Sequence, residues 1–148
     1  MIETTFQIAT PADFSLVVAA VLKQVSKTVD RAVIITLTGD LGAGKTTFTQ
    51  QLAKHLDITE PVVSPTFGIM KEYELEGNER FDQLIHIDAY RIEDISEVGP
   101  LRFEELFKTP RALICLEWPE KISEILPLEK IQVIIEIQDG GGRMVRVN

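Results

Sequence analysis

Residues 39–47 read Gly-Asp-Leu-Gly-Ala-Gly-Lys-Thr-Thr, which satisfies the Gly-x-x-x-x-Gly-Lys-Ser/Thr pattern of a phosphate-binding loop. The preceding residues, 32–38, are apolar and rich in β-branched side chains, as expected of a strand buried in a parallel sheet. The following residues, 48–56, are compatible with a helix. The motif therefore lies where its chemistry requires it, between a strand and the N-terminus of a helix.

Each residue type in this loop has a chemical reason. Its glycines permit the tight backbone path that points successive N–H groups at phosphate oxygens. A helix beginning near Lys45 would add unpaired N–H groups and the positive end of its dipole. Lys45 can reach the β- and γ-phosphates and stabilise charge during catalysis, and the Thr46 hydroxyl can bind Mg²⁺. The sequence therefore predicts a nucleotide-binding site formed by Asp40, Leu41, Gly42, Ala43, Gly44, Lys45, Thr46 and Thr47.

Two carboxylates are candidates for the rest of the catalytic site. Such a loop needs an acidic partner for the Mg²⁺ shell, usually at the C-terminal end of a neighbouring strand. Glu117 directly follows residues 112–116, which have the pattern of a strand buried on both faces, and we expect it to bind the metal. Asp88 lies near the end of the strand expected over residues 81–90, where it could orient the attacking water. For either residue the alternative is a solvated carboxylate at a strand end.

Other residues carry weaker signals. Thr66 lies in a proline-punctuated loop, where it could bind Mg²⁺ or meet the γ-phosphate, but Ser-Pro-Thr is also an ordinary turn. Trp118 follows Glu117 and could contact the nucleotide or pack inside the protein. Phe14 could stack on the base, although core packing is the commoner role of such a residue. His86 alone is interpreted as a structural residue rather than a general base.

Composition limits the class of protein. The chain has 148 residues, of which 45% are hydrophobic, and a formal net charge of -8, so we expect one domain over residues 1–148. There is no apolar run long enough to cross a membrane and no recognisable secretory signal. The single cysteine, Cys115, is typical of a protein in a reducing cytoplasm, and we expect the protein there. We also expect it to be a monomer when it is not bound to a partner. The acidic balance and scattered basic residues argue against strong direct binding to nucleic acid.

The order of expected elements predicts an α/β fold. Helical patterns alternate with the central strands, which favours parallel pairing there, whereas the strands of residues 67–75 and 81–90 are expected to form an antiparallel hairpin. The last two strands are expected to form another. We predict a three-layer sandwich of the P-loop NTPase type with a mixed parallel and antiparallel central sheet. The expected strands are 3–9, 32–38, 67–75, 81–90, 112–116, 131–137 and 144–147, and the expected helices are 14–29, 45–56, 93–107 (interrupted at Gly99-Pro100) and 120–125.

Four segments together resemble one known family. They are residues 39–47, Ser-Pro-Thr-Phe at 64–67, His-Ile-Asp-Ala-Tyr-Arg at 86–91, and Leu-Glu-Trp-Pro-Glu-Lys at 116–121. In this order they closely resemble the TsaE (YjeE) family of small bacterial ATPases, which serves the machinery that makes N6-threonylcarbamoyladenosine in tRNA. The resemblance implies a Mg²⁺-dependent ATPase that acts on the TsaB–TsaD complex and is slow without it. It also implies that Lys45 and Thr46 bind phosphate and Mg²⁺, that Glu117 completes the metal shell, that Asp88 and Thr66 serve hydrolysis, and that Trp118 lies beside the nucleotide.

Two other functions fit a phosphate-binding loop. A small-molecule kinase would usually add an arginine-rich lid over its acceptor, and no segment of this chain has clustered arginines. A non-catalytic scaffold could use ATP binding alone to order residues 62–67 for docking. The chain lacks the Asn-Lys-x-Asp segment with which GTPases read guanine, so ATP is the expected nucleotide under each interpretation.

Overall fold

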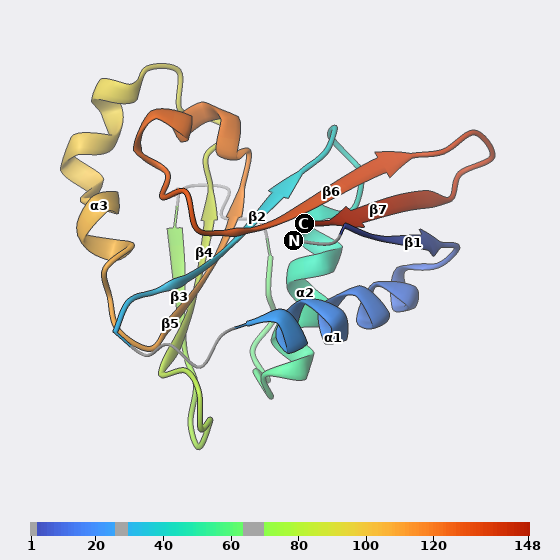
Figure 1. Cartoon of the computed structure of the whole chain (residues 1–148), viewed down its shortest axis with the longest axis horizontal. Coiled ribbons are helices and arrows are strands. Elements are labelled where there is room, and N and C mark those ends of the chain that lie inside the picture. Colours follow the sequence, from blue (N-terminus) through green and yellow to red (C-terminus); the bar gives the residue numbers. More distant parts are fainter. Residues whose placement is uncertain (1–2, 26–29, 64–69) are drawn as a thin grey trace.

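The strands form one mixed sheet in the order β1-β7-β6-β2-β5-β4-β3 (Figure 1). The computed structural model describes residues 3–25, 30–63 and 70–148. The central strands β6, β2, β5 and β4 run parallel, whereas β3, β7 and β1 pair antiparallel with their neighbours. The mixed sheet and both predicted hairpins are therefore confirmed. The strands are β1 (Thr4–Ile8), β2 (Val33–Thr38), β3 (Met70–Glu74), β4 (Gln83–Asp88), β5 (Ala112–Glu117), β6 (Ile131–Ile137) and β7 (Arg143–Val147).

Helices cover the sheet on both faces and complete the predicted three layers (Figure 1). One face carries α1 (Phe14–Gln24) and α2 (Lys45–His55), which pack against each other. The opposite face carries the short helix α3 (Phe103–Leu106) and two 3-10 helices, η2 (Ile95–Leu101) and η3 (Pro119–Ile125). In the part of the chain that the structure describes, no helix has both the length and the hydropathy needed to span a membrane.

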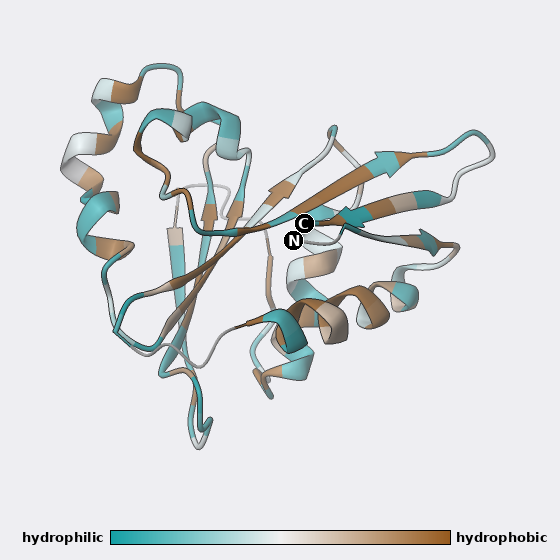
Figure 2. Ribbon diagram, in the orientation of Figure 1, coloured by the Kyte–Doolittle hydropathy of each residue, from teal (hydrophilic) through white to brown (hydrophobic). Residues whose placement is uncertain are grey.

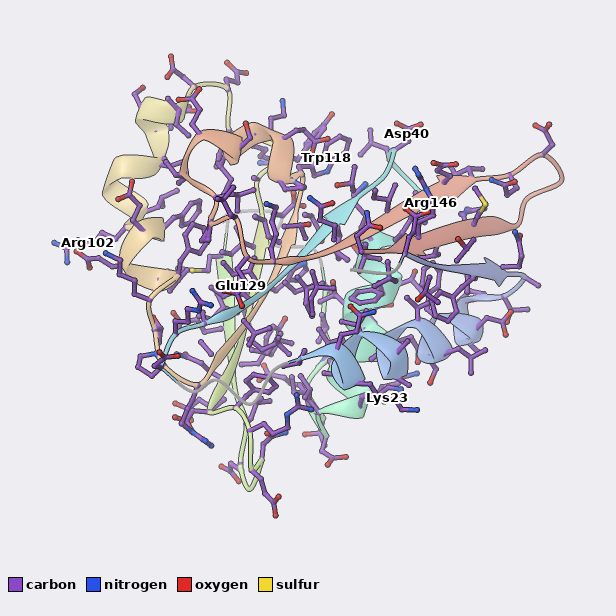
Figure 3. All side chains as sticks on the ribbon, in the orientation of Figure 1. Lys23, Asp40, Arg102, Trp118, Glu129 and Arg146 are labelled. Carbon is purple, nitrogen blue, oxygen red and sulfur yellow. The ribbon has the colours of Figure 1, made fainter. Side chains whose placement is uncertain are left out.

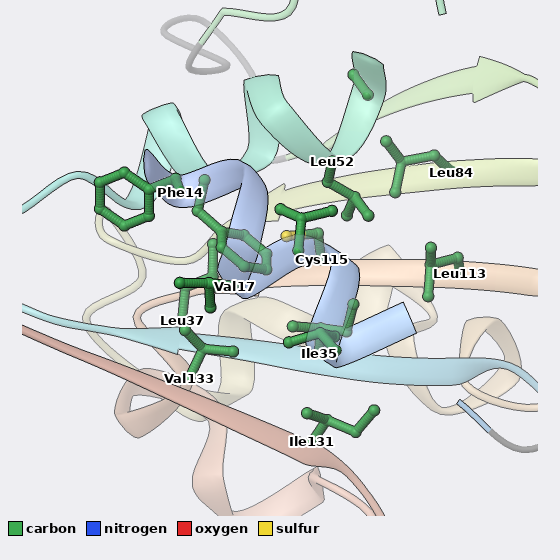
Figure 4. Close-up of a cluster of buried hydrophobic side chains, with 14 of the residues drawn as sticks. Phe14, Val17, Ile35, Leu37, Leu52, Leu84, Leu113, Cys115, Ile131 and Val133 are labelled. Carbon is green, nitrogen blue, oxygen red and sulfur yellow. The ribbon is translucent and has the colours of Figure 1, made fainter. Parts of the chain in front are cut away.

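The sheet separates two hydrophobic clusters, because successive side chains of a strand point to opposite faces. In β2, Ile35 and Leu37 join the cluster beneath α1 and α2, whereas Ile34 joins the cluster beneath α3. Figure 4 shows the first cluster, where Phe14 and Val17 of α1 meet side chains of the central strands. β5 is buried along its whole length, which explains the uninterrupted apolar sequence of residues 112–116 before Glu117. Figure 2 shows the hydrophobic residues concentrated along the central strands.

Several predicted boundaries need correction. The first helix ends at Gln24 rather than continuing to residue 29, because Val25 is extended; residues 26–29 lie outside the described part. The helical stretch predicted for residues 93–107 is divided between η2 and α3, and the break falls at Arg102, which has φ 55°, rather than at Gly99-Pro100. Strand β4 occupies only Gln83–Asp88 of the ten residues expected.

Candidate nucleotide-binding site

The predicted phosphate-binding loop, which keeps that name below, joins β2 to α2, as its sequence indicates. Gly42 has φ +80° and Gly44 has φ +120°, so the backbone takes conformations that side chains other than glycine rarely adopt. Within the loop, the Ala43 N–H donates a hydrogen bond to the Asp40 carbonyl at 3.0 Å. Lys45 is the first residue of α2, and the N–H groups of that first turn have no partners inside the helix. The backbone therefore has the form needed to surround an anion.

Two glycines also let neighbouring elements approach the loop closely. A Cβ atom on Gly39 would lie 2.7 Å from the carbonyl oxygen of Ile135 in β6. A Cβ atom on Gly44 would lie 2.8 Å from the ring of Phe14, the first residue of α1. Phe14 is only 3% exposed, so it supports the loop from the core. This burial favours the core-packing alternative for Phe14 over stacking on a base.

Lys45 extends back along the inside of the loop. Its Nζ donates hydrogen bonds to the carbonyls of Gly39 at 2.5 Å and Asp40 at 3.0 Å. It also lies 4.3 Å from the centre of the Trp118 ring. Burial lowers the pKa of Lys45 from its usual 10.5, and the nearby carboxylates of Glu117, Asp88, Glu120 and Asp40 partly oppose this shift. The Lys45 amine is thus largely buried, donates to two loop carbonyls, and lies near enough to four carboxylates for their charge to raise its pKa.

The two predicted carboxylates are adjacent across the sheet. Glu117 is the last residue of β5 and is in register with Leu37 of β2 on one side and Asp88 of β4 on the other. Glu117 therefore ends the strand next to the one that leads into the loop, where a metal-binding carboxylate was expected. Asp88 is partly buried, and one of its carboxylate oxygens accepts a hydrogen bond from the Tyr90 N–H at 3.0 Å.

Two aromatic rings border this end of the sheet. Trp118 has φ 60°, and its N–H donates to the Leu37 carbonyl at 3.3 Å, so the chain turns sharply after Glu117. The ring of Tyr90 lies 5.1 Å from that of Trp118. Figure 3 shows Trp118 and Asp40 both in the upper part of the view. The turn therefore places Trp118 beside the lysine of the loop, at the phosphate end of the candidate site.

The hydroxyl-bearing candidates are placed as follows. Thr46 and Thr47 lie in the first turn of α2 and are partly exposed. Asp40 and Leu41 are exposed on the loop. Thr66 lies outside the described residues, so its predicted role stays a prediction.

Magnesium fits the oxygen donors near the loop. Among the described residues, no three His, Cys, Asp or Glu side chains converge as a metal cage. Mg²⁺ in nucleotide sites is usually held by one or two protein oxygens together with substrate phosphates and water, so a separate cage is not required. The Thr46 hydroxyl and the Glu117 carboxylate are the protein oxygens that would hold it.

Two side chains that the sequence analysis did not assign to the site also contact its components. His86 Nε2 lies 2.6 Å from Glu117 Oε2. His86 and Asp88 are two residues apart on β4 and therefore point to the same face of the sheet, and this spacing was the signal in the sequence that could have assigned His86 to the site. Arg143 of β7 donates to the carbonyls of Gly42 and Ala43. Arg143 is 100 residues from Ala43 in the sequence, and no local motif indicates the contact.

A separate groove of about 380 Å³ lies beside η3. It includes Thr36 and Thr38, which alternate with Leu37 and therefore point to the sheet face opposite α2. None of residues 39–47 lines it, so it is distinct from the phosphate-binding loop.

Comparison with known proteins gives consistent matches. Residues 15–145 match the family model described as "Threonylcarbamoyl adenosine biosynthesis protein TsaE". The chain is 47% identical over 103 residues to the tRNA threonylcarbamoyladenosine biosynthesis protein TsaE of Bacillus subtilis strain 168, covering 70% of this chain but only 61% of that relative. It is 41% identical over 117 residues to the protein of the same name from Nostoc sp. PCC 7120, covering 77% and 68%. The crystal structure of Bacillus subtilis YdiB superimposes with a TM-score of 0.76 at 29% identity, covering 99% of this chain and 84% of that one.

Proposed function

The chain belongs to the TsaE family, and from this membership we propose that it binds and hydrolyses ATP in support of tRNA N6-threonylcarbamoyladenosine modification. The observation that carries the nucleotide part is the position of Lys45 Nζ, bonded to the carbonyls of Gly39 and Asp40 at the N-terminus of α2. The tRNA-modification part rests on the family and on the names of the relatives.

Both the backbone of the loop and the side chain of Lys45 would contact ATP. The loop N–H groups and the N-terminus of α2 would receive the phosphate oxygens. Lys45 would exchange its carbonyl partners for the β- and γ-phosphates, a stronger charge-assisted interaction. Because burial disfavours the charged amine, arrival of the negatively charged phosphates would restore its proton affinity.

Magnesium, held by Thr46 and Glu117 and by the substrate phosphates, would neutralise charge at the bond that breaks. His86, by donating to Glu117, would fix that carboxylate towards the loop. Asp88 would orient the attacking water towards the γ-phosphate, giving ADP and inorganic phosphate. During this attack, the loop N–H groups and Lys45 would stabilise the charge that develops on the transferring phosphoryl group.

The partner we propose is the TsaB–TsaD complex. With a net charge of -8, this chain is poorly suited to neutralise tRNA phosphates by itself, so it would act through proteins that engage the tRNA. Slow hydrolysis by the isolated chain and acceleration by the complex are expected, because the partner would complete or align the site.

A pull-down from cytoplasmic extract, with and without ATP·Mg²⁺, tests this proposal. We expect ATP-dependent recovery of TsaB and TsaD by the wild-type chain and loss of that dependence in Lys45→Ala. A Glu117→Gln variant that binds ATP without hydrolysing it distinguishes an ATPase from a non-catalytic scaffold. Full complementation of a strain that lacks the wild-type protein by this variant would favour the scaffold. Recovery of a phosphorylated small molecule instead of free phosphate would favour the kinase.

A further inference from the structure

The guanidinium of Arg143 connects the phosphate-binding loop to the β6–β7 hairpin. Its Nε donates to the Ala43 carbonyl at 2.8 Å, and its Nη2 donates to the Gly42 carbonyl at 3.1 Å. Its Nη1 donates to the carbonyls of Gly141 and Gly142 in the turn of its own hairpin. One planar side chain therefore fixes two carbonyls of the loop relative to two carbonyls of the turn.

The bond to the Ala43 carbonyl determines where the Gly44 N–H points. In a trans peptide, the carbonyl of one residue and the N–H of the next point in opposite directions. By holding the Ala43 carbonyl, Arg143 directs the Gly44 N–H to the other side of that peptide. Gly44 has no side chain to restrict rotation and already has φ +120°, so the peptide could otherwise reorient at low cost.

We propose that Arg143 is a positioning residue that holds the 43–44 peptide in the orientation in which the Gly44 N–H can bind the polyphosphate of a nucleotide. Its bond to the Gly42 carbonyl supports the same loop conformation, in which the Ala43 N–H donates to the Asp40 carbonyl. This role rests on the proposed function of the loop. It depends on the fork of the guanidinium, since two adjacent carbonyls accept from Nε and Nη2 at once. A lysine would keep the positive charge but could not reproduce this pair of bonds.

Calorimetric titration with ADP·Mg²⁺ tests the role in four proteins: wild type, Arg143→Gln, Arg143→Lys and Arg146→Gln. Arg146 is a matched control because it lies on the same strand, is also partly buried, and donates to Glu136 at 2.6 Å instead of to the loop. Loss of bonds from a charged donor should weaken ADP binding about tenfold or more in both Arg143 variants. Arg146→Gln should bind ADP within about twofold of wild type, because Arg146 pairs with Glu136 and not with the loop.

Hydrogen exchange without nucleotide gives an independent reading of the same proteins. We expect faster exchange in the peptide covering residues 39–48 of Arg143→Gln, with unchanged exchange in β2 and β5. A uniform increase across the sheet, or an unchanged loop, would overturn the positioning role, as would wild-type ADP affinity in Arg143→Lys. If the wild-type chain itself binds no ADP, the proposed function fails and the role with it. If the wild-type chain binds ADP and Arg143→Gln binds it equally well, only the role of Arg143 is overturned.

Discussion

His86 Nε2 lies 2.6 Å from Glu117 Oε2, and both side chains are buried beneath the end of the sheet that carries the phosphate-binding loop. The pair joins β4 to β5 through side chains as well as through the strand ladder. Among the described residues, His86 Nδ1 has no hydrogen-bond partner, and the ring makes its side-chain hydrogen bond to Glu117 through Nε2. The imidazole therefore orients a carboxylate proposed to bind the metal.

Replacing His86 tests this orientation. In His86→Leu the Glu117 carboxylate would stay buried without its donor, so the free energy of unfolding should fall by about 2 kcal/mol. The Mg²⁺ concentration for half-maximal ATP hydrolysis should rise about tenfold, as for other residues that orient metal ligands. His86→Gln, which can place an N–H near the lost Nε2, should recover most of the Mg²⁺ dependence. Equal Mg²⁺ requirements in His86→Leu and wild type would contradict the role.

Trp118 should report the charge on Lys45. It is the only tryptophan in the sequence, and Lys45 Nζ lies 4.3 Å from its ring centre. Burial lowers the pKa of Lys45 below 10.5, so on raising the pH the amine loses its proton earlier than an exposed lysine would. We expect the emission of Trp118 to change, and ATP affinity to fall, as the pH rises through this lowered pKa.

A Tyr90→Phe background removes the hydroxyl of the neighbouring ring from that signal, since the two rings are 5.1 Å apart. In the same background, Lys45→Met should abolish the transition. A transition that persists in Lys45→Met would show that another group is responsible.

The two loop glycines with positive φ, Gly42 and Gly44, should differ in their tolerance of alanine. At Gly42 a Cβ meets nothing within 4 Å, so Gly42→Ala should lower the free energy of unfolding by about 1 kcal/mol from backbone strain alone. At Gly44 the Cβ would also meet the Phe14 ring at 2.8 Å, so the loss should be about 3 kcal/mol. Urea denaturation measures both values. The addition of Phe14→Leu should reduce the cost of Gly44→Ala, and equal losses for the two alanine variants would contradict the packing described.

Cys115 should be chemically inert in the folded protein. It is fully buried on β5, and burial raises its pKa to about 12. At pH 8 a reagent therefore cannot reach the sulfur, and the reactive thiolate form is scarce. A thiol reagent should label it at pH 8 only after denaturation. Rapid labelling of the native chain, with unchanged circular dichroism, would show that the sheet face beneath α2 is open.

The sequence was sufficient to predict the parts of this fold that depend on local patterns. The apolar residues before Gly39 and the glycines of the loop determine a strand, a turn and a helix in succession, and the structure has all three. The break in the helix was predicted at Gly99-Pro100 and not at Arg102, because glycine and proline are the stronger local signals for the end of a helix. Their preference for ending a helix was overridden by a 3-10 helix that continues to Leu101.

Contacts between residues far apart in the sequence were harder to predict from the sequence. The side chain of Arg143 reaches Gly42 across 101 residues, and only the completed sheet brings β7 to the loop. The burial of Phe14 follows from the packing of α1 against α2, which neither helix determines alone. By contrast, Glu117 and Asp88 could be predicted together, since parallel strands place their C-terminal ends at one edge.

Titration of the purified chain with ATP·Mg²⁺ in a calorimeter, beside Lys45→Ala, tests the central claim most directly. We expect a saturable heat for the wild-type chain and its loss in Lys45→Ala, with the thermal stability of the variant retained. No heat from the wild-type chain at ATP concentrations well above millimolar, or equal binding by the two proteins, would contradict a nucleotide site centred on Lys45.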